Sequence, residues 1–333
     1  MIARLVAVGL AVLLAAPALG AQAQLSYRSG QNISPAYEGW QEDADGSRYF
    51  LFGYMNRNWE EELDVPIGPE NSFSPGPLDV GQPTHFLPRR NRFTFRVPVP
   101  DGFTEQDELV WTLTSNGVTE KAYASLRPDY LVDNVVIASE TGSLGAGTSS
   151  PETRSNTPPI VEIEGDAFRH ARVGQPITLV ARITDDGLPR PRGSRDGDDD
   201  EDEDDAEEEG DSAASGEADE EPELSPELQA LQRALNPPRR VTVGKINGLF
   251  FSWFVYRGTK DVEFHPPQVK TWEDTRAAAN SPWAALWTPP PLPENGRWVV
   301  QATFAEPGTY VLRGRADDGG LYGDGEITIH VME

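Results

Sequence analysis

The sequence predicts an all-β protein of two β-sandwich domains, the second interrupted by a disordered acidic loop and a short helix. The end of the chain, from Gly308 to Val331, alternates apolar and polar residues with the period of two that half-buried strands require. Turns rich in Gly, Asn and Asp separate this segment and others like it. About 310 residues after a leader are enough for two domains.

A tyrosine and a tryptophan indicate which kind of sandwich the second domain forms. Pro307-Gly308-Thr309-Tyr310 precedes an alternating strand, as in the tyrosine corner of immunoglobulin-type sandwiches, where the phenol bonds to upstream backbone. Trp253 would be the core tryptophan of the third strand. Leu179 and Leu312 stand roughly where a disulfide-bearing sandwich carries its two cysteines. We therefore expect immunoglobulin-like domains.

The first 23 residues predict a secretory signal peptide. Arg4 precedes an apolar run from Leu5 to Ala16, and small residues follow around Gly20 and Ala23. The run is too short to span a bilayer comfortably. We expect an exported protein, periplasmic or secreted, with no membrane span after cleavage. Its domains must be stable without disulfides, because the chain has no cysteine.

The net charge of −26 is concentrated in one tract. Residues 196–223 hold 18 carboxylates and no Lys or Arg, which leaves 36 acidic residues against 28 basic ones elsewhere. A nucleic-acid partner is excluded, because the phosphate backbone requires a basic face. The segment 196–221 is too charged and too poor in apolar residues to form a core, so we expect a disordered loop.

Residues 24–140 are predicted to form the first sandwich. Its strands include 49–54 and 92–99, the latter with Phe93, Phe95, Val97 and Val99 on one face. Asn116-Gly117 joins two further strands, because a type I′ hairpin turn needs positive φ at both central residues. The apolar segment 131–138 is predicted to be a closing strand. A linker rich in Gly, Ser, Thr and Pro spans 141–159.

Residues 160–333 are predicted to form the second sandwich, with an insertion at 188–240. Ile177, Leu179, Ala181 and Ile183 would face its core. Within the insertion, Ser225–Leu235 is predicted to be a short helix with a Ser cap and a Pro at its first position.

Two motif patterns carry resemblances. Phe52-Gly53-Tyr54, with Asn56 and Asn58, followed by 66–71 and 81–88, resembles a β module of exported and surface-associated bacterial proteins. That resemblance covers about 49–113 and implies a non-catalytic structural or adhesive role. From the residues alone, the Gly, Pro and Asn of 66–88 favour a long ordered loop over a binding site.

The second domain carries the other resemblance. Gly174-Gln175-Pro176, Thr184-Asp185-Asp186-Gly187 and the run from Pro307 to Gly319 resemble PKD-like and related immunoglobulin-like repeats of exported proteins. The long insertion departs from that pattern and leaves the pairing of the middle strands open.

Trp272, Trp283 and Trp287 are the candidate ligand-binding residues. They lie in a Pro-rich stretch, and flat aromatic faces suit a sugar ring or a peptide. The alternative, which the sequence favours, is that they cover an open sandwich edge. If these residues bind, the expected partner is an envelope glycan or another exported protein. The oligomeric state stays open.

Five carboxylates at predicted turns are the candidate metal ligands. Asp185, Asp186, Asp317, Asp318 and Asp324 would reach one end of the second sandwich, where Ca²⁺ accepts six to eight oxygens. The alternative is that Asp-Asp-Gly only makes good turns. Ca²⁺ is the one candidate cofactor.

Catalytic motifs are missing from the sequence. The four histidines are scattered, and no Gly-x-Ser-x-Gly or phosphate loop occurs. The preferred function is an exported, non-catalytic structural or adhesive protein of the bacterial envelope or exterior. The alternatives are a glycan- or peptide-binding module that uses the loop 272–287, and a hydrolase with a spatially assembled carboxylate pair.

Overall fold

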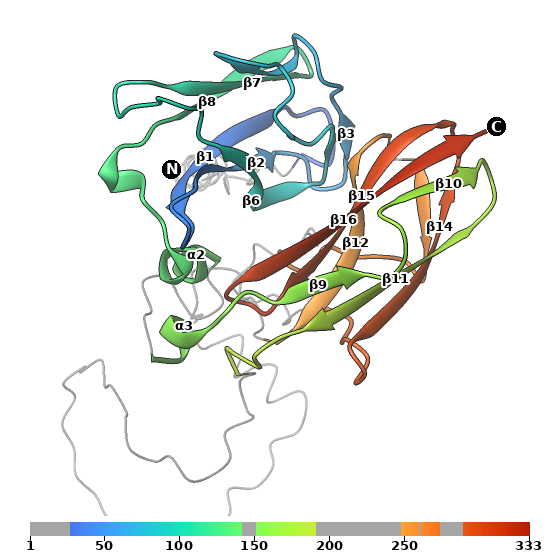
Figure 1. Ribbon diagram of the computed structural model, residues 1–333. Helices are drawn as coiled ribbons and strands as arrows, with labels where there is room; N and C mark the ends of the chain where they lie inside the picture. The colour runs from blue at the N-terminus through green and yellow to red at the C-terminus, as the bar shows by residue number, and fades with distance from the viewer. Residues whose placement is uncertain (1–26, 142–150, 191–247, 260, 274–288) are drawn as a thin grey trace, which may run out of the picture.

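The computed structural model describes residues 27–141, 151–190, 248–259, 261–273 and 289–333. Within them the chain forms two β-sandwiches that lie against each other (Figure 1). The predicted signal peptide, the acidic tract 196–223, the predicted helix Ser225–Leu235, Trp283 and Trp287 lie outside the described residues. None of the helices in the described part is long and apolar enough to cross a membrane.

The first sandwich packs two three-stranded antiparallel sheets. One sheet has the order β1 (Ile33–Glu42), β2 (Arg48–Asn56), β6 (Arg89–Pro98). The other has the order β4 (Asn71–Ser74), β7 (Leu109–Ser115), β8 (Val118–Ala124). A two-residue ribbon of β3 (Leu63–Asp64) and β5 (His85–Phe86) adds to them.

Aromatic side chains fill the core of the first sandwich. Phe73 stacks on Trp111 with ring centroids 5.8 Å apart, and Phe52 stacks on Phe95 at 5.5 Å. At the β7–β8 hairpin, Asn116 and Gly117 have φ values of 48° and 76°. These positive values are what a type I′ turn requires, as the sequence predicts.

The second sandwich has the strand distribution of an immunoglobulin domain. One sheet has the order β13 (Val262–His265), β14 (Arg297–Phe304), β11 (Ile177–Thr184), β9 (Ile160–Ile163). The other has the order β10 (Phe168–Arg172), β16 (Tyr322–Met332), β15 (Gly308–Asp317), β12 (Phe250–Arg257). In chain order this is the ABED and CFG arrangement, with β10 added parallel to β16. The protein is all-β, with immunoglobulin-like sandwiches.

The core of the second sandwich places the predicted marker residues together. Trp253, Leu179 and Leu312 are buried in one cluster. The hydroxyl of Tyr310 donates a 3.0 Å hydrogen bond to the carbonyl of Glu306, which ties the entry of β15 to the preceding turn. Leu179 and Leu312 thus lie on the two strands that carry the cysteines in a disulfide-bearing immunoglobulin domain. Here apolar packing, and not a covalent bond, holds the two sheets together.

The predicted closing strand at 131–138 is wrong. A 3₁₀ turn at Pro128–Tyr130 precedes the segment, and α2 (Asn134–Thr141) begins within it. A second helix, α3 (Pro151–Ser155), lies within the predicted linker. The carboxylate of Asp133 accepts the Val136 N–H at 2.9 Å, which caps the start of α2. Ile137 and Ala138 of this helix then pack against Leu321 of the second domain. The cap and this contact override the β propensity of the Val-Val-Ile run.

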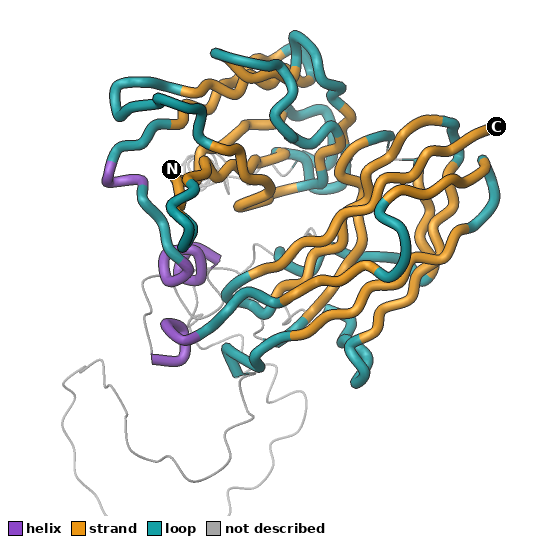
Figure 2. The backbone as a smooth tube through the Cα atoms, viewed as in Figure 1, coloured by secondary structure: helices purple, strands orange, loops and turns teal. Residues whose placement is uncertain are grey.

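Strand β12 belongs to a sheet of the second sandwich, but its side chains pack in the cores of both domains. Every residue of β12 from Phe250 to Tyr256 is buried. Phe251, Trp253 and Val255 lie in the core of the second domain, whereas Phe254 and Tyr256 lie in the core of the first. Figure 2 shows the first sandwich lying alongside the sheet that contains β12. Through β12, the hydrophobic core of the second domain therefore joins that of the first, without a disulfide in either.

Candidate functional site

A bulge in β6 prepares the first domain for the contact. The β2–β6 register skips between Phe52 and Tyr54, and Phe93 has φ of 47°. A bulge leaves main-chain groups of the extra residue without a partner in the ladder, and it changes the direction in which nearby side chains point. As a result Phe93 joins the cluster around Leu51, so the predicted common face of 92–99 is wrong for Phe93. Phe95, Val97 and Val99 do pack in one cluster, as the sequence predicts.

Two buried arginines of β15 dock on that bulge. Arg315 donates to the carbonyls of Arg92 and Phe93 at 3.3 and 3.0 Å, and Arg313 donates to the carbonyl of Thr94. Carboxylates of the neighbouring strand β16 balance both charges. Asp324 accepts from Arg315 at 2.7 and 2.8 Å, and Glu326 accepts from Arg313.

The Gly- and Pro-rich loop of the first domain makes a second contact with β12. Tyr256 donates from its hydroxyl to the carbonyl of Gly81 at 2.5 Å, and Arg257 pairs with Asp79 at 2.6 Å. The main-chain N–H of Thr84 donates to the carbonyl of Tyr256 at 3.1 Å. The sequence predicts a long ordered loop over 66–88, but the structure places β4 and β5 within it, and the stretch between these two strands is a loop. That loop carries the contact with β12.

Lys270 makes a third contact. Its ammonium group donates to the carbonyls of Pro88 and Arg90 at 3.0 and 2.6 Å and pairs with Glu273. Burial lowers the pKa of Lys270 to about 8, although the charge of Glu273 opposes that shift. A lysine held this way fixes the segment after β13 to the first domain.

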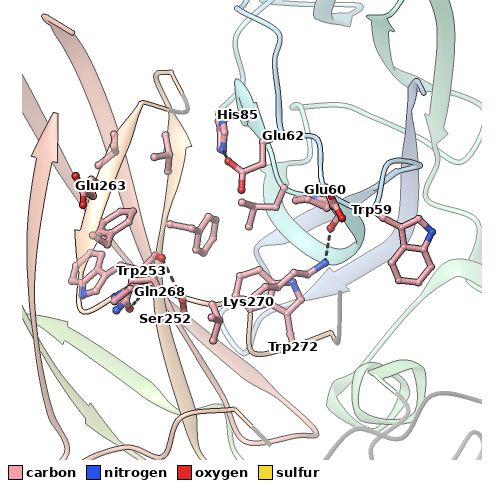
Figure 3. Close-up of a pocket in the computed structure, with 18 residues that line it drawn as sticks. Trp59, Glu60, Glu62, His85, Ser252, Trp253, Glu263, Gln268, Lys270 and Trp272 are labelled. Carbon is pink, nitrogen blue, oxygen red and sulfur yellow. Dashed lines mark hydrogen bonds and ion pairs between the residues drawn. The ribbon is translucent and has the colours of Figure 1, made fainter. Parts of the chain in front are cut away.

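A cleft of about 720 Å³ opens between the domains beside these contacts (Figure 3). Trp59, Glu60, Glu62 and His85 line it from the first domain. The opposite wall comes from β12, β13 and the segment after them. Its side chains include Phe254, Val262, Glu263, Phe264, Gln268, Val269, Lys270 and Trp272.

His85 is a strongly perturbed titratable group of the cleft, as is Lys270. Its Nδ1 lies 2.7 Å from Asp64 Oδ1 and its Nε2 lies 3.2 Å from Glu62 Oε2. Burial opposes the charged form, but the hydrogen bonds to Asp64 and Glu62 outweigh it and raise the pKa of His85 to about 9. The imidazolium is therefore a clamp between two carboxylates, and at neutral pH it is not free to act as a base.

The cleft carboxylates do not form an acid–base pair. Glu60 pairs with Arg28 at 2.7 Å and Glu62 pairs with His85, and both remain partly solvated. A general acid at neutral pH needs a carboxyl in an apolar, buried setting. The predicted hydrolase alternative gains no support from this arrangement.

Trp272, the one candidate ligand-binding tryptophan that is described, spans the domain contact. Its Nε1 donates to Asn91 Oδ1 at 3.2 Å, and its ring lies 5.2 Å from that of Phe254. The guanidinium of Arg315 lies 5.2 Å from the ring centroid. The structure leaves Trp272 half-buried at the cleft, with its polar atom and one face already engaged.

The five candidate calcium ligands engage different partners. Asp324 binds Arg315, and Asp186 accepts from the N–H and hydroxyl of Thr157 at 2.8 and 2.7 Å. Asp317 is buried and accepts the Gly319 N–H at 2.9 Å. Asp185 and Asp318 line a smaller cavity of about 490 Å³. The described residues contain no group of three or more acidic, His or Cys side chains that could hold a metal ion. The calcium site stays a prediction.

Asp318, like Asp317, is buried. Its Oδ1 accepts the N–H groups of Gly320 and Leu321 at 2.6 Å each, and its Oδ2 accepts from Asn156 at 3.1 Å. Burial raises the pKa of Asp318 to about 7 against the effect of those N–H bonds. Its bonds shape the β15–β16 turn and hold the chain after α3 to it.

Sequence reasoning missed Arg313, Arg315, Lys270 and His85. Arg313 and Arg315 alternate with apolar residues, a pattern that normally marks a solvent-facing side. The signal that was present is β12: its residues are apolar on both faces, which indicates a strand covered on both sides.

No protein family and no curated protein matches the sequence. Among solved structures, domains 1–6 of the surface layer protein SbsC align over 91% of this chain and 28% of that one, at 6% identity and a TM-score of 0.22. Sidekick-1 immunoglobulin domains 1–4 align over 90% and 48%, at 8% identity and a TM-score of 0.21. A chimeric titin Z1Z2 aligns over 91% and 99%, at 8% identity and a TM-score of 0.22. The chain thus spans less than half of the first two proteins. At these scores the fold assignment rests on the strand order itself.

Proposed function

We propose that this chain is an exported, non-catalytic structural or adhesive protein of the bacterial envelope or exterior, in which two sandwiches act as one rigid body. The observation that carries the proposal is the docking of Arg313 and Arg315 on the bulged carbonyls of β6. The partners across the interface are backbone carbonyls, and another domain geometry would leave these buried carbonyls and guanidinium N–H groups without hydrogen bonds. A fixed angle between two sandwiches suits a protein that spaces or presents surfaces at a cell boundary.

The location rests on the sequence. The first 23 residues have the pattern of a signal peptide, and both domains resemble modules of exported proteins. The partner in this proposal is an envelope glycan or another exported protein. Fractionating cells that express the chain with and without residues 1–23 tests export, and equal cytoplasmic retention of the two would contradict it.

Rigidity is tested with paired variants. Arg313→Ala/Arg315→Ala should broaden the small-angle scattering distance distribution, because the interface loses its bonded charges. The control, Arg182→Ala/Arg297→Ala, removes exposed ion pairs to Glu164 on the other sheet and should leave the distribution unchanged.

The structural role is tested in cells that carry the same variants. Surface attachment and detergent resistance should fall with the arginine pair of the interface and persist with the control pair. Normal phenotypes with both pairs would contradict the structural role. Turnover of envelope polymers by the purified wild-type protein would contradict the non-catalytic one.

A glycan- or peptide-binding role is the second candidate, favoured by the cleft. Its volume falls in the range of ligand sites, and Trp59 and Trp272 contribute aromatic surface. The candidate loop continues to Trp283 and Trp287. If it binds an envelope polysaccharide, Trp283→Ala or Trp287→Ala abolishes retention in affinity electrophoresis and leaves the melting temperature unchanged. Lost stability without lost retention would identify an edge cover.

A further inference from the structure

His170 and His330 stand side by side on the second sandwich. Strands β10 and β16 run side by side (Figure 1). They pair in parallel, with His170 opposite His330. Their ring centroids lie 5.8 Å apart and the ring planes are perpendicular. Both side chains are exposed. The fold therefore joins two imidazoles that come from opposite ends of the second domain.

Neighbouring side chains orient the two rings. Thr309, opposite His330 on β15, places its hydroxyl 3.2 Å from His330 Nδ1. Metal-binding histidines usually donate one ring N–H to such a partner, which leaves the other nitrogen for the metal. If Nδ1 donates to Thr309, Nε2 of His330 is free to bind. Phe168 contacts the ring of His170 edge-on at 5.1 Å and limits its rotation.

The spacing of the rings suits a shared metal ion. Metal–imidazole bonds are about 2.0–2.1 Å, so two rings at neighbouring positions of a square-planar or tetrahedral ion have centroids about 4.5–5 Å apart. The observed separation of 5.8 Å closes to that value by a small rotation of exposed side chains. Neutral imidazole suits Cu²⁺, Ni²⁺ and Zn²⁺ better than Ca²⁺ or Mg²⁺, which prefer oxygen.

We propose that His170 and His330 form a surface site for a late first-row divalent transition metal, with Cu²⁺ bound most tightly. Each imidazole supplies one nitrogen, water completes the coordination shell, and Thr309 is a positioning residue for His330. Cu²⁺ leads because affinity for nitrogen ligands rises along the series to copper.

The proposed site also links two strands. In its sheet β10 is an outer strand that pairs with β16 alone. An ion held by one residue of each strand joins β10 to β16. Because a ligand that binds only the folded state stabilises it, Cu²⁺ should raise the melting temperature.

The test uses the full chain without a histidine tag, titrated with Cu²⁺ in the presence of excess Mg²⁺ to occupy oxygen-rich sites. Electron paramagnetic resonance of the wild type should show coupling to two nitrogens. His170→Ala and His330→Ala should each lose at least tenfold in affinity and lose the rise in melting temperature. Thr309→Val should weaken binding several-fold without removing it.

His265→Ala is the matched control, because His265 is an exposed histidine on another strand, β13. It should bind Cu²⁺ as the wild type does. Circular dichroism checks that each variant is folded, and His170→Gln and His330→Gln replace any alanine variant that is not. Unchanged affinity or unchanged nitrogen coupling in the folded variants at 170 and 330 would overturn the proposal, as would equal losses in the control.

Discussion

The guanidinium of Arg315 in the second domain donates a 3.0 Å hydrogen bond to the carbonyl of Phe93 in the first. Phe93 has a positive φ, at a bulge that releases this carbonyl from the ladder of β2 and β6. A local irregularity of one domain thus supplies the acceptor for a buried charge of the other. The bulge provides a free carbonyl, and Arg315 provides the hydrogen-bond donor that this buried carbonyl needs.

Arg315→Ala should therefore destabilise the protein by about 3–5 kcal/mol, because two interface carbonyls lose their donor and Asp324 keeps only Arg313, at 3.7 Å. Urea unfolding gives the value. Arg182→Ala, which removes an exposed pair with Glu164 at 3.5 Å, is the control and should cost less than about 1 kcal/mol. Equal losses for the two variants would show that the interface arginine contributes no more than a surface ion pair.

His85 should make stability depend on pH. Its pKa is raised from 6.5 to about 9, so the folded state holds the proton more tightly than the unfolded state does. The resulting stabilisation is fully present below pH 6.5 and is lost as pH rises through about 9. The unfolding free-energy difference between wild type and His85→Gln should shrink by about 3 kcal/mol between about pH 6 and pH 9.5.

Comparing both proteins at each pH cancels the contribution of other groups, including Lys270. A difference that stays constant with pH would mean that His85 does not hold the extra proton.

Deleting residues 196–221 should change the melting temperature by only a few degrees. The tract is too charged to form a core, and the entropy of closing a loop changes slowly with its length. Differential scanning calorimetry gives the comparison. A fall of more than about ten degrees would mean that the tract is integrated into the fold.

Two substitutions in the core of the second domain should lower the free energy of unfolding by different amounts. Tyr310→Phe removes the hydrogen bond to the Glu306 carbonyl and the 3.2 Å bond with the Thr259 hydroxyl, and should cost about 1–2 kcal/mol. Trp253→Ala empties a fully buried site and should cost about 3–5 kcal/mol. Denaturant unfolding of both variants gives the two losses of stability, and that of Trp253→Ala should be the larger. A Trp253→Ala protein as stable as the wild type would contradict the packing of β12.

Several strands and core residues of each sandwich followed from periodicity and turn chemistry, but β1 and β10 did not. Trp253, Tyr310 and the Asn116-Gly117 hairpin needed only local rules, because each depends on its own strand or turn. Sequence spacing could not pair His170 with His330, because their proximity exists only once β10 lies along β16.

The domain contact was hidden for a related reason. In a strand, an arginine that faces solvent and one that faces another domain have the same spacing. Arg313 and Arg315 therefore looked like surface residues until their acceptors in β6 were known. Likewise, the helical cap at Asp133 competes with the β propensity of the residues after it, and a tertiary contact of Ile137 decided the outcome.

The parallel pairing of β10 with β16 has a mechanical consequence. Phe168 begins β10 opposite Thr328, and Met332 ends β16 opposite Arg172. A pull on Met332 directed away from Phe168 draws the two strands past each other along their length. Their evenly spaced hydrogen bonds are then strained together rather than opened one after another. A force applied along β16 must therefore break all the hydrogen bonds between β10 and β16 together, which requires a larger force than breaking them one by one.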